Sequence, residues 1–200
     1  MALGHPTLSR LALKAWVLNI PATKKIGQQA RVERLTDPSG WAPRQIARLQ
    51  VRRFGMEWRE SDIRDMLRSG AMICFTHVTR RTGAPLRLNG YVLFRTMAAE
   101  GEILSVAVRG QARRRGIAAI LMAHVLQDMR DAKVQRVFLE VGEANRAAIN
   151  FYKRTNFEIV GQRNNYYRSI SGHKSNALVL RWTAGSQNHI VVPQRGRVEI

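Results

Sequence analysis

The chain has 200 residues, of which 45% are hydrophobic and 24% charged, which fits one globular domain with a buried core rather than two domains. Its single cysteine excludes a disulfide within the chain and favours a reducing compartment. No apolar run reaches the roughly 18 to 20 residues of a membrane span, so we expect a soluble, cytoplasmic protein.

Positive charge is the most unusual property of the composition. Thirty-three Lys and Arg residues against 14 Asp and Glu give a formal net charge of +19, and residues 1–34 and 161–200 each hold 6 basic residues and 1 acidic residue. Such ends are suited to contact RNA, the ribosome, a membrane surface or an acidic partner, or are solvated tails without a target. We expect a basic extension over 1–30, a folded domain over 31–183 and a basic tail over 184–200.

Hydrophobic periodicity predicts the elements of the first half of the domain. A turn sequence with Gly and Pro, Thr82–Pro85, separates two strand-like runs and predicts a hairpin. In chain order, the expected elements are a strand over 32–35, a helix that Pro43 opens over 43–54, a helix after Ser61 that ends near 67, and strands over 72–78 and 88–94.

The second half alternates strands and helices. The pattern predicts a strand over 102–108, a helix over 113–131, a strand over 134–141, a helix over 147–154, and last strands over 157–162 and 177–182. Asn145 is placed to cap the shorter helix, and Asn156 occupies the left-handed position that ends it. The fold class is therefore α/β or α+β, with a mixed sheet of about six to seven strands and helices on both faces.

Three arginines and a glycine precede the long helix of the second half. The first turn of a helix carries partial positive charge and unpaired N–H groups, so cations are disfavoured there unless an anion satisfies both. Small residues let a phosphate approach the backbone, and arginines supply charge and paired donors. The residues of this predicted phosphate-binding turn are Arg113, Arg114, Arg115, Gly116, Ile117 and Ala118.

This turn, placed after the strand Val106–Val108, resembles the motif of the GCN5-related N-acetyltransferases. That motif is a strand, then Gln or Arg, two variable residues, Gly, one variable residue, and Gly or Ala at the start of a helix. The later segment, Leu139–Val141 followed by Asn145, Tyr152 and Phe157, is similar to the bacterial ribosomal-protein-alanine N-acetyltransferases. The resemblance covers about 31–183 and is strongest over 102–167.

The resemblance implies a fold, a co-substrate and a set of site residues. It implies a central strand pair that is splayed apart, acetyl-CoA as the donor, and the diphosphate of that donor in the 113–118 turn. It also implies Glu140 as general base and Tyr152 as general acid, and it implies no metal. The residues that it assigns to the rest of the cofactor are Val106, Ala107, Val108 and Asn145.

The acceptor is a primary amine that must lose a proton before it attacks a thioester. An α-amino group, with a pKa near 8, yields that proton about 2.5 units more readily than lysine, so a protein N-terminus, for example of a ribosomal protein, is the favoured acceptor. Two alternatives remain: a small amine or lysine side chain as acceptor, and a ribosome- or RNA-binding module on the same fold.

Other motifs point to no further chemistry. Cys74 and His77 are nominally a nucleophile and a base, but their apolar strand favours core packing. The five histidines show no metal-ligand spacing, and the stretch before residue 118 lacks the Lys-Ser or Lys-Thr of a nucleotide P-loop. We therefore expect neither a metal site nor a kinase.

Overall fold

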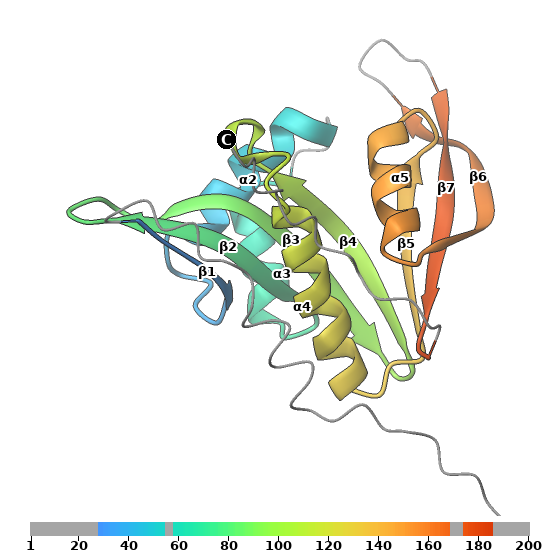
Figure 1. Cartoon of the computed structure of the whole chain (residues 1–200), viewed down its shortest axis with the longest axis horizontal. Helices are drawn as coiled ribbons and strands as arrows, with labels where there is room; N and C mark the ends of the chain where they lie inside the picture. Colours follow the sequence, from blue (N-terminus) through green and yellow to red (C-terminus); the bar gives the residue numbers. More distant parts are fainter. Residues whose placement is uncertain (1–27, 55–57, 169–173, 186–200) are drawn as a thin grey trace, which may run out of the picture.

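A computed structural model describes residues 28–54, 58–168 and 174–185, in which seven strands form one mixed sheet (Figure 1). The strand order is β1-β2-β3-β4-β5-β7-β6, and the predicted mixed α/β class is confirmed. The strands are β1 (Gln28–Arg34), β2 (Ile73–Arg81), β3 (Arg87–Met97), β4 (Glu100–Val108), β5 (Arg136–Gly142), β6 (Glu158–Arg168) and β7 (Lys174–Thr183). The helices are α2 (Ala42–Phe54), α3 (Glu60–Arg68), η1 (Gly110–Ala112), α4 (Ile117–Asp131) and α5 (Arg146–Arg154).

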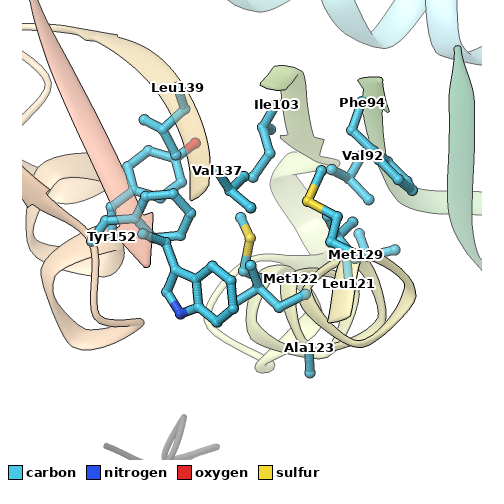
Figure 2. Packing of buried hydrophobic residues seen from close by; sticks show 14 of the residues in the cluster. Val92, Phe94, Ile103, Leu121, Met122, Ala123, Met129, Val137, Leu139 and Tyr152 are labelled. Carbon is cyan, nitrogen blue, oxygen red and sulfur yellow. The ribbon is translucent and has the colours of Figure 1, made fainter. Parts of the chain in front are cut away.

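The helices cover both faces of the sheet, as the alternation of strands and helices predicts. On one face, α4 and α5 close a core that includes Leu121, Met129 and Trp182, and Figure 2 shows the side chains of α4 between those of β3 and β5. On the other face, α2 and α3 cover a second core around Ile46, Ile63 and other buried apolar residues. Strands β2 and β3 are therefore shielded from water on both faces, and their middle residues are buried on both.

The predicted hairpin is confirmed, and β2 pairs antiparallel with β3. Every neighbouring pair in the sheet is antiparallel except β4 and β5, which are parallel because α4 connects them. Figure 1 shows β4 and β5 close together at one end and far apart at the other, where α4 begins. The splayed central pair that the family resemblance implies is confirmed.

Several element boundaries differ from the predictions. The helix predicted over 113–131 begins at Ile117, because Arg114 and Gly116 have left-handed backbones with φ of 60° and 77° that a right-handed helix cannot include. The first strand, β1, begins at Gln28, before the predicted start of the domain. The last two strands, β6 and β7, extend beyond the ranges predicted for them. The predicted extension up to residue 27 and the predicted tail from residue 186 lie outside the described residues.

The caps predicted around α5 are confirmed. The side-chain oxygen of Asn145 accepts a hydrogen bond from the N–H of Ala148 at 3.2 Å, and so satisfies one of the unpaired donors at the helix start. Asn156 has a φ of 65°, the left-handed conformation expected after the last turn.

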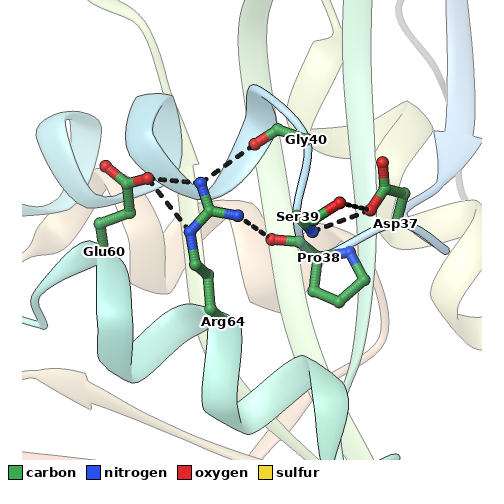
Figure 3. Close-up of polar contacts among 6 residues, drawn as sticks. All are labelled: Asp37, Pro38, Ser39, Gly40, Glu60 and Arg64. Carbon is green, nitrogen blue, oxygen red and sulfur yellow. Dashed lines mark hydrogen bonds and ion pairs between the residues drawn. The ribbon is translucent and has the colours of Figure 1, made fainter.

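One arginine of α3 holds the loop before α2 (Figure 3). The guanidinium of Arg64 pairs with Glu60 and donates to the carbonyl oxygens of Pro38 and Gly40. In the same loop the carboxylate of Asp37 accepts hydrogen bonds from the hydroxyl and N–H of Ser39, which lower the pKa of Asp37. These contacts fix α2 against α3, which form one wall of the molecule beside β4.

Gly90 is a position where β3, β4 and α4 meet with no room for a side chain. A Cβ there would lie 3.0 Å from the carbonyl oxygen of Ala107 and 3.1 Å from Cγ2 of Ile117. We expect Gly90→Ala to lower the free energy of unfolding by about 1–3 kcal/mol because the strands must separate. Urea denaturation measures this, and Gly110→Ala, with nothing within 4 Å of the added Cβ, is the control. Equal unfolding midpoints for the two variants would contradict the packing described.

Candidate active site

The candidate site is the gap between β4 and β5. Parallel pairing joins Glu100–Ile103 to residues 136–139 and stops at the pair Ile103–Leu139. Beyond that pair, the described residues of β4 have no partner in β5, although β4 continues to pair with β3 and β5 with β7. An unpaired row of backbone N–H and C=O groups therefore lines one side of the gap.

Val106 and Val108 direct their backbone groups toward this gap. The N–H of Arg109 donates to the carbonyl of Asn89 in β3 at 2.7 Å, and backbone groups alternate in direction along a strand. Residues 106 and 108 therefore face away from β3, whereas Ala107 faces β3 and its side chain is buried. One of the gap-facing groups has a partner, since the carbonyl of Val108 accepts from Nε of Arg113 at 3.3 Å.

The turn after β4 combines exposed arginines with a helix start that has no acidic residue. Arg113, Arg114 and Arg115 are exposed and precede α4 instead of forming its first turn, which corrects the prediction. Gly116 is the N-cap residue, makes no side-chain cap, and is followed by a helix without an acidic residue in its first turn. Ile117 is buried in the core and Ala118 is half-buried, so their backbone is held while its N–H groups stay near the surface.

Glu140 lies on β5 at the level where the gap has opened. Its neighbours Leu139 and Val141 are buried in the core on the α4–α5 face, so the Glu140 side chain points to the opposite face. That side chain is 20% exposed and forms an ion pair with Nε of Arg163 from β6 at 2.8 Å. The second carboxylate oxygen makes no hydrogen bond to the described residues.

Tyr152 approaches β5 from the other face. It lies on α5, is 9% exposed, and belongs to the core that contains Leu139 (Figure 2). Its ring packs against Phe151 and meets Phe157 edge-on at 5.8 Å between centroids. Glu140 and Tyr152 therefore flank β5 from opposite faces, at the strand that borders the gap.

Asn145 lies between the end of β5 and the start of α5, shortly after Glu140 in the sequence. Its side-chain oxygen caps α5, as described above, which confirms the structural role expected for it. A contact between Asn145 and a cofactor stays a prediction, as do the cofactor contacts of Val106, Ala107, Val108 and residues 113–118.

Arg163 is a site residue that sequence reasoning did not find. It lies level with Ala177 of β7 and reaches past that strand to Glu140, and its guanidinium stacks over Tyr166 at 5.4 Å. The contact with Glu140 has no local pattern, because the pairing of β5, β7 and β6 brings together residues far apart in sequence. The only available signal was its position just before the Asn164–Tyr167 run that carries part of the family resemblance.

Cys74 and His77 do not form a nucleophile and base pair. Cys74 is fully buried in the core under α2 and α3, where burial raises the pKa of its thiol. The ring of His77 contacts the Asn89 side chain at 3.3 Å, and burial lowers the pKa of His77. The prediction of core packing is confirmed.

The described residues hold neither a cluster of metal ligands nor a helix suited to span a membrane. No three or more His, Cys, Asp or Glu side chains lie close enough there to hold a metal ion together. In the same part of the chain, none of the helices combines the length and the apolar character needed to cross a bilayer.

A splayed parallel strand pair, with a basic glycine turn at its open end, defines the class as an α/β protein of the N-acetyltransferase fold. The chain belongs to the acetyltransferase (GNAT) family, because the model of that family matches residues 44–157, more than half of its length. The membership that the sequence motifs predicted is thus confirmed.

Among curated proteins, the [ribosomal protein bS18]-alanine N-acetyltransferase of Salmonella typhimurium is 28% identical over 88 residues, which are 44% of this chain and 60% of that protein. The N-alpha-acetyltransferase of Sulfurisphaera tokodaii is 36% identical over 73 residues, which are 36% of this chain and 44% of that protein. The chain thus matches 60% or less of the length of these two relatives.

Solved structures share the fold over nearly their whole length. The ribosomal-protein-S18-alanine N-acetyltransferase of Escherichia coli has a TM-score of 0.63 and 18% identity, with 86% of this chain and 99% of that chain covered. Arabidopsis thaliana NAA60 in complex with acetyl-CoA has a TM-score of 0.67 and 19% identity, with 78% of this chain and 99% of that chain covered.

The buried thiol of Cys74 leads to a prediction about its reactivity. A thiol whose pKa is raised by burial stays protonated, and the thiolate is the reactive form. We expect the folded protein to resist Ellman's reagent at mildly alkaline pH, and the single thiol of the chain to react fully once denaturant is added. Prompt labelling of the folded protein would show that Cys74 is accessible and would reopen its assignment as a core residue.

Proposed function

We propose that this protein is an acetyl-CoA-dependent N-acetyltransferase that acts on the α-amino group of a protein N-terminus. The observation that carries the proposal is the end of β4–β5 pairing at Ile103–Leu139. It leaves the backbone groups of Val106 and Val108 facing a gap, with an anion-suited turn at the end of β4 and two ionisable side chains on β5 and α5. Support for the donor comes from the family and from the relative of the same fold solved with acetyl-CoA.

The donor would lie along the open edge of β4. The turn from Arg113 to Ala118 would hold its diphosphate, through unpaired N–H groups at the start of α4 and through guanidinium groups. Left-handed conformations at Arg114 and Gly116 help successive N–H groups converge on one anion, as in other anion-binding turns. The pantetheine arm would then add to β4 as a strand does, hydrogen-bonding with Val106 and Val108.

The reaction would be a direct transfer. The acceptor nitrogen attacks the thioester carbon, a C–N bond forms, and the C–S bond breaks. Glu140 takes a proton from the amine through its unpaired oxygen or one water, and Tyr152 gives a proton to the departing thiolate. Since Glu140 and Tyr152 flank β5 from opposite faces, the amine and the thiolate would approach the gap from opposite sides. Arg163 would hold the carboxylate of Glu140 in place.

The choice of acceptor rests on chemistry and on relatives. An α-amino group has a pKa about 2.5 units below that of lysine, so it loses its proton to a carboxylate more readily. Relatives from Salmonella typhimurium and Sulfurisphaera tokodaii are named as acetyltransferases of a ribosomal-protein alanine and of α-amino groups. Both observations favour an N-terminal amine over a side chain or a small amine.

The turn gives a binding prediction. We expect Arg114→Gln combined with Arg115→Gln to weaken coenzyme A binding about tenfold, since each exposed charge-assisted contact contributes on the order of 1 kcal/mol or less. Titration calorimetry measures the affinity. Gln keeps a Cβ, so the left-handed requirement at Arg114 is unchanged.

Two controls make the binding result specific. Arg80→Gln combined with Arg81→Gln removes the same charge from the β2–β3 hairpin and should leave the affinity for coenzyme A unchanged. Acetyl-pantetheine lacks the diphosphate, so its KM should not respond to the turn variant. An unaltered affinity for coenzyme A in the turn variant would refute the assignment of the diphosphate.

The catalytic pair gives a turnover prediction. We expect Glu140→Gln and Tyr152→Phe each to lower kcat about 10²- to 10⁴-fold, because each removes a proton-transfer group and keeps the shape of the side chain. Both should bind coenzyme A as the wild type does. Glu143→Gln makes the same chemical change three residues further along and should retain activity.

The acceptor is identified in the same assay. Peptides with free and with acetyl-blocked N-termini, each containing one lysine, are incubated with acetyl-CoA, and mass spectrometry locates the added group. Transfer to the free N-terminus alone supports the proposal. Transfer to the lysine of the blocked peptide would make the protein a side-chain acetyltransferase, and wild-type turnover in both catalytic variants would refute the roles of Glu140 and Tyr152.

A further inference from the structure

Six exposed arginines gather at one end of the sheet, and three of them have no place in the proposed reaction. Three of them flank the turn between β2 and β3, and the other three lie in the turn before α4. This set, the arginine face, consists of Arg80, Arg81, Arg87, Arg113, Arg114 and Arg115, all of them exposed.

The two groups of the arginine face are joined by contacts. Nη2 of Arg87 donates to the side-chain oxygen of Gln111 in η1 at 2.7 Å, one residue before Ala112 and two before Arg113. Arg80 and Arg81 continue β2 just beyond Thr79, which pairs with Arg87 across the hairpin. Figure 1 shows this hairpin projecting beyond the helices that cover the sheet. The face therefore runs from a protruding hairpin to the start of α4.

Among the residues that the structure describes, no acidic side chain forms an ion pair with the arginine face. The sequence has no Asp or Glu between residues 66 and 99 or between 103 and 127, the two stretches that contribute to it. Among the described residues, the ion pairs all involve other cations. Six like charges kept together in this way are unfavourable for folding, and an anionic partner would relieve the repulsion.

The composition of the face favours a phosphate backbone over other anionic partners. Guanidinium groups match phosphate oxygens with paired donors, and all six cations are arginines instead of lysines. The exposed large apolar side chains of the described chain are Met97, Ile159, Val160 and Tyr166, none of which belongs to this face. Membrane binding relies on apolar side chains beside the cations, and protein interfaces on aromatic and aliphatic anchors.

We propose that the arginine face is a binding surface for the phosphate backbone of RNA, which shares its three turn arginines with the proposed donor site and adds the three arginines of the hairpin. Arg80, Arg81 and Arg87 on the projecting hairpin make contacts that do not overlap the donor site. The turn arginines extend the same surface toward the gap. Binding of this kind reads backbone shape and charge and is insensitive to base sequence.

The test measures RNA affinity of the full chain as a function of salt. A fluorescent RNA duplex of about 16 base pairs is titrated with wild type and with Arg80→Gln combined with Arg81→Gln, at salt concentrations from about 50 to 200 mM. We expect the slope of log affinity against log salt to fall in magnitude by about 2 in the variant, one for each lost phosphate contact. Affinity at the lower salt concentration should drop roughly tenfold.

A matched control removes equal charge elsewhere. Arg68→Gln combined with Arg154→Gln replaces two exposed arginines, on α3 and α5, and should leave both slope and affinity as in the wild type. An equal loss in this control, or an unchanged slope in the hairpin variant, would overturn the proposal. So would tighter binding to phosphatidylserine vesicles or to polyglutamate than to RNA.

Acetyl transfer is measured on the same preparations, which separates the two proposals. The hairpin variant should retain wild-type kcat and KM, because neither residue is part of the donor or acceptor machinery. Absence of acetyl transfer in the wild type with intact RNA binding would count against the enzymatic proposal alone. Full acetyl transfer with no RNA binding by the wild type would overturn only the proposal that the arginine face binds RNA.

Discussion

The short parallel pairing between β4 and β5 is the constraint on which the site depends. Four residue pairs hold the two halves of the sheet together, and the pairing stops at Ile103–Leu139. On the face that α4 covers, Met122 and Met129 pack in the core that both halves share (Figure 2). Arg130 adds a contact by stacking over Trp182 of β7 at 5.0 Å, and burial there lowers the pKa of Arg130. The gap is thus held open by packing, so its backbone groups stay available.

Packing fixes the position of the start of α4, and the local charges give it a positive potential. Ile117 anchors the helix in the core beside Gly90, and this close approach fixes where the first N–H groups of the helix point. Because Gly116 has no side chain and the first turn has no carboxylate, nothing within the helix start competes with an incoming anion. The same absence of carboxylates leaves the arginines of the turn without intramolecular partners that would neutralise them. The positive, carboxylate-free start of α4 is therefore a consequence of local sequence and of one tight contact.

Local features of this kind are what sequence reasoning could reach. Periodicity located the hairpin and the long helix, and residue chemistry identified the caps at Asn145 and Asn156, because each depends on neighbours along the chain. Phosphate binding by the 113–118 turn stays a prediction. The helix start was misplaced, since periodicity does not register a left-handed residue such as Arg114. The pair Glu140–Arg163 was missed because it depends on the order of β5, β7 and β6, in which the last two strands are reversed relative to the sequence. The placement of Glu140 and Tyr152 on opposite faces of β5 likewise depends on how α5 packs against the sheet, which the local sequence does not show.

Charge distribution, rather than total charge, distinguishes the roles of the arginines. Most described carboxylates are already engaged: Glu33, Asp128, Glu60, Asp65, Glu102, Glu100, Glu140 and Glu158 each pair with a guanidinium. Exposed pairs of this kind contribute little to stability, so their main effect is to cancel charge where they occur. Cancellation is spread over α3, β5 and the edge strands, and it stops at the hairpin and the turn. If the excess of cations over carboxylates were scattered over the surface, it would favour no particular region. Here the excess is concentrated beside the open end of β4. The positive charge at this end of the sheet therefore comes from two segments, the hairpin and the 113–118 turn.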